Sequence, residues 1–328
     1  MVYGFSDFML FYLIVARMRT VFKGGVGKRW EIRGSPASEK MLPFTIPPLN
    51  IGVMDFAICN EIFQGWKIED AIQYAAKTGY AGIEIAPFTL SKYVTDIPKP
   101  ERHRIREMAA RAEIAITGIH WVLAQTEGLF LTHSDPLVRD RSSKYFIELV
   151  EFCSDIGGNI IVVGSPKQRN IPEGATAAQA WDWAKQTLKP AVTRALQRGV
   201  TICLEPLSPQ ETNFINTAEE AVRFVKQFHS ASLKVILDVK AMSSEQKPIP
   251  QIIQETYPHF AYFHANDKNL KGPGFGDVDF KPIARTLLEV DYQGWVSVEV
   301  FNFDEGPEAI ATRSLDYLKK TFTAAWKE

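Results

Sequence analysis

The sequence predicts an α/β fold of the (β/α)8 (TIM) barrel type over about residues 51–322. Two observations lead to this prediction. Eight short apolar runs alternate with longer amphipathic stretches, and one run plus one stretch takes roughly 30 residues, the length of one strand–helix unit. Most of the runs are continuously apolar, which is typical of parallel strands covered on both faces. A doubly wound open sheet is the main alternative, but no GxGxxG motif follows the first run.

The apolar runs are the predicted strands, and helical patterns separate them. The runs cover residues 51–58, 81–86, 115–120, 159–163, 200–205, 233–238, 259–264 and 295–301. In 138–156 and 177–198, apolar residues recur three or four positions apart, which predicts an amphipathic helix in each. Thr217, with Glu220 three residues later, is a capping-box pattern that predicts a helix over 217–228. Three glycines follow helical patterns at positions where a left-handed C-cap favours glycine: Gly79, Gly157 and Gly199.

The N-terminal residues differ from the rest of the chain. We predict that residues 1–50 form an extension largely outside the fold, and that a single barrel domain covers 51–328. The apolar run Phe8–Ala16 is shorter than the about 20 residues that span a bilayer. Basic residues follow this run, whereas those of a signal peptide precede it. We therefore expect no membrane span and a peripheral position for residues 1–40.

Composition and charge are ordinary for a soluble globular protein. Apolar residues make up 46% of the chain and charged residues 23%. The net charge of −1 gives no global field that would attract nucleic acid, so we expect no nucleic-acid partner. The cysteines are widely spaced, which fits neither a disulfide framework nor a CxxC metal site: Cys59, Cys153 and Cys203. Reduced buried thiols favour a cytoplasmic location.

Polar side chains end four successive apolar runs: Glu205, Asp238, His264 and Glu299. A (β/α)8 barrel carries its active site at the carboxyl ends of its strands, so we expect these side chains to converge. An isolated charge at the edge of an apolar core is costly and needs a partner, hydrogen bonds or a metal. Three carboxylates and one imidazole suit Mn²⁺ or Mg²⁺, with Co²⁺ or Zn²⁺ as further options. Separate structural carboxylates are the alternative.

Motifs around these residues carry a family resemblance. They are Leu204-Glu-Pro-Leu207 with Glu211-Thr-Asn213, Leu237-Asp238, Phe263-His-Ala-Asn-Asp267, the loop 272–280 and Val298-Glu299. Together they resemble the xylose isomerase-like sugar isomerases and epimerases, nearest the tagatose/psicose 3-epimerase branch. The resemblance implies that the four strand-end residues bind one divalent ion, usually Mn²⁺, and that Glu205 and Glu299 also act as the acid/base pair. It also implies that Glu211 contacts the carbonyl end of the substrate.

The resemblance implies a metal-dependent isomerase or epimerase that removes a proton alpha to the carbonyl of a ketose or related keto-sugar, through a metal-stabilised enediolate. Two substrate-contacting residues of the branch are missing. Ala241 stands where the branch usually has histidine, and only Lys268 and Lys271 stand near the place of its arginine. An inosose dehydratase or another keto-sugar lyase is therefore an alternative, as is a catalytically silent sugar-binding barrel. Relatives are often dimers or tetramers, so a homo-oligomer is expected.

Further residues are predicted to line the mouth of the barrel. Glu84 and His120 end the second and third runs and are expected to point into the mouth. Trp66, after the first run, is a candidate apolar wall for a sugar. Lys271 precedes a glycine-rich loop that could close over substrate or bind a phosphate. An endonuclease IV-like DNA-repair function is disfavoured, because it would need several more strand-end histidines than His120 and His264.

Overall fold

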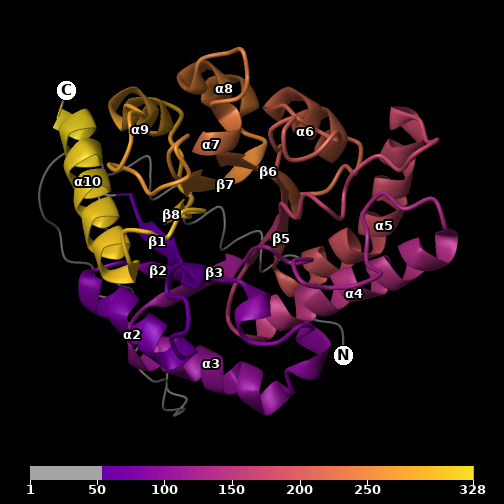
Figure 1. Cartoon of the computed structure of the whole chain (residues 1–328), viewed down its shortest axis with the longest axis horizontal. Helices are drawn as coiled ribbons and strands as arrows, with labels where there is room; N and C mark the ends of the chain where they lie inside the picture. Colours follow the sequence, from indigo (N-terminus) through magenta and orange to yellow (C-terminus); the bar gives the residue numbers. More distant parts are fainter. Residues whose placement is uncertain (1–53, 328) are drawn as a thin grey trace, which may run out of the picture. The chain divides into compact units, whose positions relative to one another are not determined.

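The computed structural model describes residues 54–327 of this 328-residue chain. In this part, eight parallel strands close into a barrel in the order β1 to β8, with β1 hydrogen-bonded to both β2 and β8. Helices follow the strands and surround the barrel (Figure 1). The predicted (β/α)8 barrel is therefore confirmed. The predicted extension 1–50 and the start of the predicted strand 51–58 lie outside the described residues.

Each strand lies within or beside one of the predicted runs. The strands are β1 Phe56–Cys59, β2 Gly82–Ile85, β3 Ala115–Ile119, β4 Ile160–Val163, β5 Thr201–Leu204, β6 Leu233–Asp238, β7 Phe260–Ala265 and β8 Val296–Val298. The pairing of β6 with β7 aligns Asp238 with His264. The register of the barrel thus places two of the candidate ligands side by side.

Helices cover the outer face of the strands in the described part. They are α2 Ile68–Thr78, α3 Lys99–Arg111, α4 Pro136–Asp155, α5 Ala177–Arg198, α6 Ala218–Lys226, α7 Val239–Met242, α8 Ile249–Thr256, α9 Phe280–Glu289 and α10 Pro307–Lys327. Short 3-10 turns are η1 Asn60–Ile62, η2 Pro87–Thr89 and η3 Val94–Asp96. Among residues 54–327, no helix is long and apolar enough to cross a membrane.

The helix ends follow the sequence signals closely. Gly79 and Gly199 have φ angles of 100° and 66°, so both take the left-handed conformation predicted for C-caps. Thr217 caps α6 by accepting a hydrogen bond from the backbone N–H of Glu220 at 3.2 Å. The Glu220 carboxylate accepts from the backbone N–H of Asn216 rather than from that of Thr217. Half of the predicted capping box is therefore present, and its acidic half is displaced by one residue.

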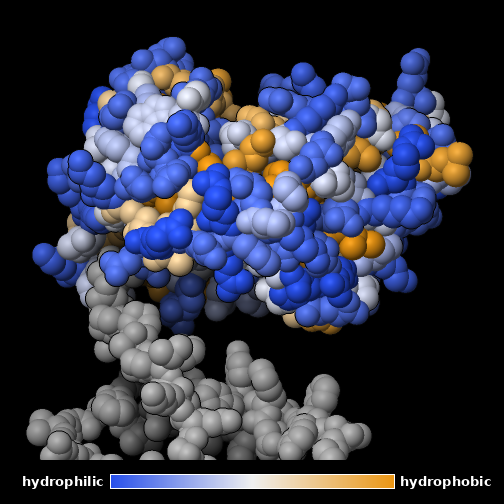
Figure 2. Space-filling model, turned by 90° about the horizontal axis from the view of Figure 1, so that it is seen from below, coloured by the Kyte–Doolittle hydropathy of each residue, from blue (hydrophilic) through white to orange (hydrophobic). Residues whose placement is uncertain are grey.

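Apolar residues fill both the space between strands and helices and the interior of the barrel. The interior cluster consists of Ile160, Val162, Cys203, Ile236 and Tyr262. Residues two positions apart in a strand face the same side. Asp238 follows Ile236, and His264 follows Tyr262, by two positions, so both face the interior one layer nearer the mouth. The outer face seen in Figure 2 is mainly hydrophilic, with scattered hydrophobic patches.

Candidate metal and catalytic site

The four side chains expected to converge lie together at the carboxyl ends of β5 to β8. Each of Glu205, Asp238, His264 and Glu299 offers one ligand atom, and these atoms all lie within 4.8 Å of one another. All four residues are buried. Gly164, just after β4, leaves room for this cluster, because a Cβ there would stand 1.6 Å from a carboxylate oxygen of Glu205. The sequence analysis therefore found the correct group of neighbours.

The donor set fits a divalent metal ion. His264 Nδ1 and Glu299 Oε2 are buried and lie 3.0 Å apart, yet neither makes a hydrogen bond. Buried polar atoms without partners are rare in folded proteins, and a bound cation is one of the few groups that would satisfy them. Three carboxylates with one imidazole form a hard, oxygen-rich set of the kind that Mn²⁺ and Mg²⁺ prefer. The cluster is thus a buried candidate site for a divalent ion.

Crowding of the carboxylates shifts their pKa values in different directions. Burial, together with repulsion from Glu299 and Asp238, raises the pKa of Glu205 well above its usual range. Burial also raises the pKa of Asp238. Burial alone would raise the pKa of Glu299 as well, but the neighbouring His264 imidazole outweighs it and holds that pKa below the ordinary value. The buried Arg169 guanidinium donates to the Glu205 backbone carbonyl on the β5 side of this cluster.

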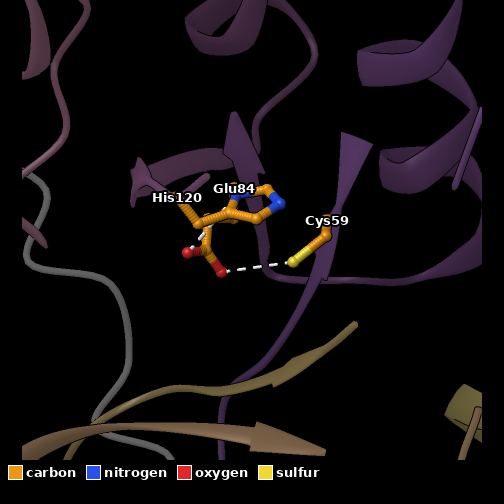
Figure 3. A group of neighbouring side chains, drawn as sticks. All are labelled: Cys59, Glu84 and His120. Atoms are coloured by element: carbon orange, nitrogen blue, oxygen red, sulfur yellow. Dashed lines mark hydrogen bonds and ion pairs between the residues drawn. The ribbon is translucent and has the colours of Figure 1, made fainter. Parts of the chain in front are cut away.

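Glu84 occupies a different place from the one expected. Its side chain lines neither the aromatic cavity nor the small one described below, and its carboxylate contacts Nε2 of His264, the ring nitrogen that points away from the cluster. The reason is the register of the strands, which aligns Glu84 with Cys59 of β1. The next inward residue of that segment, Glu61, is two positions further on and one layer nearer the mouth. Figure 3 shows the Glu84 carboxylate between the Cys59 thiol and the His120 ring.

The Glu84 carboxylate acts as a hydrogen-bond acceptor for its surroundings. One of its oxygens, Oε2, lies near four donors: Cys59 Sγ at 3.4 Å, Tyr262 OH at 3.0 Å, His264 Nε2 at 3.0 Å and Ser297 Oγ at 2.9 Å. Burial opposes ionisation, but the two nearby histidines and these donors lower the pKa of Glu84 to about 2. The contact with Nε2 leaves Nδ1 of His264 facing the cluster. Glu84 therefore positions a candidate ligand.

His120 lies at the mouth as expected, where it pairs with a residue that the sequence analysis missed. His120 Nε2 lies 2.7 Å from Glu61 Oε2, and His120 Nδ1 lies 3.5 Å from Glu84 Oε1. Burial would lower the pKa of His120, but the two carboxylates raise it to about 9. Glu61 belongs to the turn η1, after β1 has ended. The sequence could have indicated Glu61 by its position two residues after the inward-facing Cys59, because residues two apart in an extended segment face the same side.

Lys240 is a cation of the site, and sequence reasoning missed it too. Its Nζ lies 2.6 Å from Glu211 Oε1 and 4.0 Å from the centre of the Phe301 ring. Lys240 and Glu211 line a small cavity together with Glu205 and Glu299. The predicted neighbour Glu211 is therefore at the cluster. The sequence could have indicated Lys240 by its position in the first turn of α7, two residues after the strand-end Asp238.

An aromatic cavity of about 760 Å³ adjoins the cluster. Its aromatic lining residues are Phe63, Trp66, Phe88, Trp121, Phe301 and Phe303. Trp121 and Phe301 line both this cavity and the small one, and the Trp121 indole N–H donates to Glu299 Oε1 at 3.0 Å. Trp66 is thus in the place expected of an apolar wall. The volume is ample for a sugar-sized ligand.

Lys271 is engaged elsewhere. Its Nζ lies 2.7 Å from Glu305 Oε1, and Lys271 lines neither the aromatic cavity nor the small one. The expectation that Lys271 faces a substrate is therefore not supported by its position. The cysteines Cys59, Cys153 and Cys203 are buried and unpaired, as expected.

Comparisons with known proteins agree with this geometry. A family model described as "Xylose isomerase-like TIM barrel" matches residues 72–321. A D-psicose 3-epimerase from Ruminiclostridium cellulolyticum is 29% identical over 235 residues, which is 70% of this chain and 77% of that protein. A 3-dehydro-D-guloside 4-epimerase from Escherichia coli is 24% identical over 267 residues, covering 79% of this chain and 97% of that one. The solved structure of an L-ribulose 3-epimerase superposes with a TM-score of 0.73 at 17% identity, covering 84% of this chain and 96% of the other.

Proposed function

The chain belongs to the xylose isomerase-like TIM barrel family, and we propose that it is a metal-dependent epimerase or isomerase acting on a ketose or related keto-sugar. One observation carries the proposal. Glu205 and Glu299, from β5 and β8, lie in one metal-type cluster and line one small cavity. Two carboxylates facing one reacting carbon can remove a proton on one side and return it on the other.

A divalent ion, Mn²⁺ by resemblance with Mg²⁺, Co²⁺ or Zn²⁺ as further options, would polarise the substrate carbonyl and so acidify the neighbouring C–H. Glu205, Asp238, His264 and Glu299 are the residues that would hold it. Of these, Glu205 and Glu299 would also carry the proton on a carboxylate oxygen. The direction of the reaction decides which of them accepts the proton first.

Other residues of the site would bind and orient the sugar. Lys240 and Glu211 place a positive and a negative group on the same wall of the small cavity. Lys240 would donate to the electron-rich oxygens at the carbonyl end, and Glu211 would accept from a hydroxyl group. His120 also lines the small cavity, and it contacts Glu61, which lines the aromatic cavity together with Trp66. The aromatic wall would exclude water and contact the apolar face of the sugar.

A second candidate is the same proton chemistry on a keto-glycoside, with dehydration of an inosose as a further variant. The observation in its favour is the pair of departures from the ketose branch. Ala241 stands where that branch has a histidine that contacts substrate, and only Lys268 and Lys271 stand near the place of its arginine. The adjoining aromatic cavity would accept a larger substrate than a free ketose. A silent sugar-binding barrel would not need both Glu205 and Glu299.

Proton exchange with D₂O tests the proposal without a prior choice of substrate. The Mn²⁺-loaded protein is incubated with separate ketoses, inososes and 3-keto-glycosides, and deuterium at the alpha carbon is measured by NMR. Exchange is expected with at least one class, and Glu205→Gln and Glu299→Gln should abolish it while circular dichroism stays unchanged. Glu305→Gln is the matched control, because this glutamate pairs with Lys271 away from both cavities. Full exchange in metal-free protein would refute the mechanism.

A further inference from the structure

A second group of ligand-type side chains lies on the β1–β3 side of the mouth. Glu61, His120 and Glu299 each offer one ligand atom within 4.8 Å of the others, and all three are buried. We propose that these residues form a second site for a divalent cation, which shares Glu299 with the first. The inference deepens the proposed function and rests on it only in that Glu299 serves the first ion as well.

Unsatisfied atoms point to a ligand at this place. Glu61 is only 7% exposed, and its Oε1 makes no hydrogen bond in the described structure. Glu299 Oε2, which also makes no hydrogen bond, faces His264 Nδ1 of the first site at 3.0 Å, so it would be shared between the two ions. Burial and the lost hydration of such oxygens cost free energy unless a donor or a cation replaces the water. Both atoms belong to residues of the proposed site.

The Glu84 carboxylate lies close to one ring nitrogen of each histidine. Glu84 Oε2 lies 3.0 Å from His264 Nε2, and Glu84 Oε1 lies 3.5 Å from His120 Nδ1. The other nitrogen of each ring faces a carboxylate, at 3.0 Å from Glu299 for His264 and at 2.7 Å from Glu61 for His120. Histidines that ligate metals usually direct their second nitrogen to such a carboxylate. One buried acid therefore contacts both imidazoles, through a hydrogen bond to His264 and through a longer ion-pair contact to His120 in which neither atom makes a hydrogen bond.

Cys59 and Glu84, although close to His120, do not form the site themselves. Burial, with the charges of Glu84 and Glu61, raises the pKa of the Cys59 thiol well above its usual range, so it stays protonated and donates to Glu84 (Figure 3). The Oε2 atom of Glu84 is already surrounded by donors. Cys59 is not among the three residues of this group, whose two carboxylates and one imidazole favour a hard ion such as Mn²⁺ or Mg²⁺ over Zn²⁺.

A second ion would offset negative charge that is buried at the mouth of the barrel. Five buried carboxylates surround the two histidines: Glu61, Glu84, Glu205, Asp238 and Glu299. The remaining pair, Lys240 with Glu211, balances itself. The buried Arg169, whose guanidinium donates to the Glu205 backbone carbonyl, supplies one positive charge. With neutral imidazoles, one divalent ion then leaves two of the five negative charges without compensation, and a second ion leaves none. Uncompensated charge is expensive in a buried site, so either a cation or a proton on His120 must supply the difference.

The second site is open toward the substrate side. Glu61 lines the aromatic cavity of about 760 Å³, and His120 lines the small cavity of the first site. Three protein ligands leave coordination positions for water or for sugar hydroxyl oxygens. An ion held there would bind the part of the sugar that extends past Trp121, and it would make the chain a two-metal sugar enzyme.

Counting bound Mn²⁺ tests the inference with a readout separate from activity. Full-length protein is stripped with a chelator, dialysed against Mn²⁺ and assayed for metal per chain, with isothermal titration of the same samples. The wild type should bind two ions, Glu61→Gln and His120→Asn one ion, and Glu305→Gln, the matched control, two. The single ion retained by Glu61→Gln also shows that the barrel of this variant is folded.

Three outcomes would overturn the inference. One ion per chain in an active wild type would leave the proposed function standing and make His120 a protonated partner of Glu61. Two ions in both the wild type and Glu61→Gln would place the second ion elsewhere. No bound ion in the wild type would overturn the proposed function and this inference together. The metal count therefore separates failure of the second site from failure of the first.

Discussion

The two halves of the barrel mouth relate differently to the ends of their strands. In the half built by β5 to β8, Asp238 is the last residue of its strand, while Glu205 and Glu299 come directly after theirs. In the half built by β1 to β3, Glu61 lies in a turn beyond its strand, and Glu84 lies beneath the cluster, at the ring nitrogen of His264 that points away from it. The height of a side chain in a barrel thus depends on register and alternation as well as on where its strand ends.

The halves also differ in how their charges are matched. On the β5–β8 side, three carboxylates share one imidazole. On the β1–β3 side, Glu61 faces His120, and Glu84 faces both histidines. The first half has the composition of a metal and proton-transfer site, and the second half holds the ring nitrogens in place. If the β1–β3 half also binds an ion, the two halves differ in their affinity for that ion.

Glu299→Gln should have the largest effect, because Glu299 belongs to both halves. Loss of a proton-transfer carboxylate should lower alpha-proton exchange by about 10³-fold, within the 10²–10⁴-fold range of acid–base catalysis. Exchange is measured in D₂O with saturating Mn²⁺ and the best substrate of the wild type. Glu61→Gln should lose less, since Glu61 is outside the proposed acid/base pair. Equal losses in the two variants would remove the functional distinction between the halves.

Glu84→Gln should weaken Mn²⁺ binding by about 10–100-fold, the usual effect of losing a carboxylate that orients a histidine ligand. The dissociation constant is measured by titration calorimetry, with circular dichroism to verify the fold. Ser297→Ala is the matched control, because it removes one donor to Glu84 at 2.9 Å and leaves the contact with His264. An unchanged dissociation constant in Glu84→Gln would show that the imidazoles are oriented by packing alone.

Lys240→Met should raise KM by about tenfold, because a hydrogen bond to a charged group contributes about 1.5–3 kcal/mol. Lys240→Arg should recover part of that loss, since it keeps the charge. Steady-state kinetics on the substrate found by exchange gives both parameters. Lys271→Met, which removes a cation paired with Glu305, should leave KM unchanged. Equal effects of the two lysine substitutions would contradict a role for Lys240 in binding.

The sequence predicted correctly those features that depend on one strand at a time. The fold and the grouping of the four candidate ligands of the β5–β8 half follow from apolar runs that end in a polar or charged residue. Sequence reasoning failed where the position depended on neighbouring strands. The prediction places Glu84 at the end of its run, but β2 continues to Ile85, so Glu84 lies inside the strand and pairs with Cys59. Glu61 lies in η1 and Lys240 in α7, each beyond the end of its strand. The sequence could have indicated them only through their spacing, two residues after the inward-facing Cys59 and Asp238.

The smallest expected effect concerns the pH dependence of stability without metal. The pKa of His120 is raised to about 9, so its pairing with Glu61 stabilises the fold fully below the ordinary value of about 6.5. This contribution is lost as pH rises through about 9. Metal-free wild type should therefore lose on the order of a few degrees in Tm between pH 6.5 and 9, relative to His120→Asn measured in parallel. A difference that does not change with pH would show that His120 is neutral throughout.

Added Mn²⁺ then distinguishes the two halves directly. An imidazole that binds a metal cannot be protonated, so an ion at Glu61, His120 and Glu299 would remove the pH dependence attributed to His120. An ion at the first site alone would leave it in place, because His120 would still need a proton to balance Glu61 and Glu84. The Tm difference between wild type and His120→Asn, followed across pH with and without Mn²⁺, therefore identifies the charge that the β1–β3 half carries. Persistence of the pH dependence at saturating Mn²⁺ would mean that this half holds a proton and that only the β5–β8 half holds a metal.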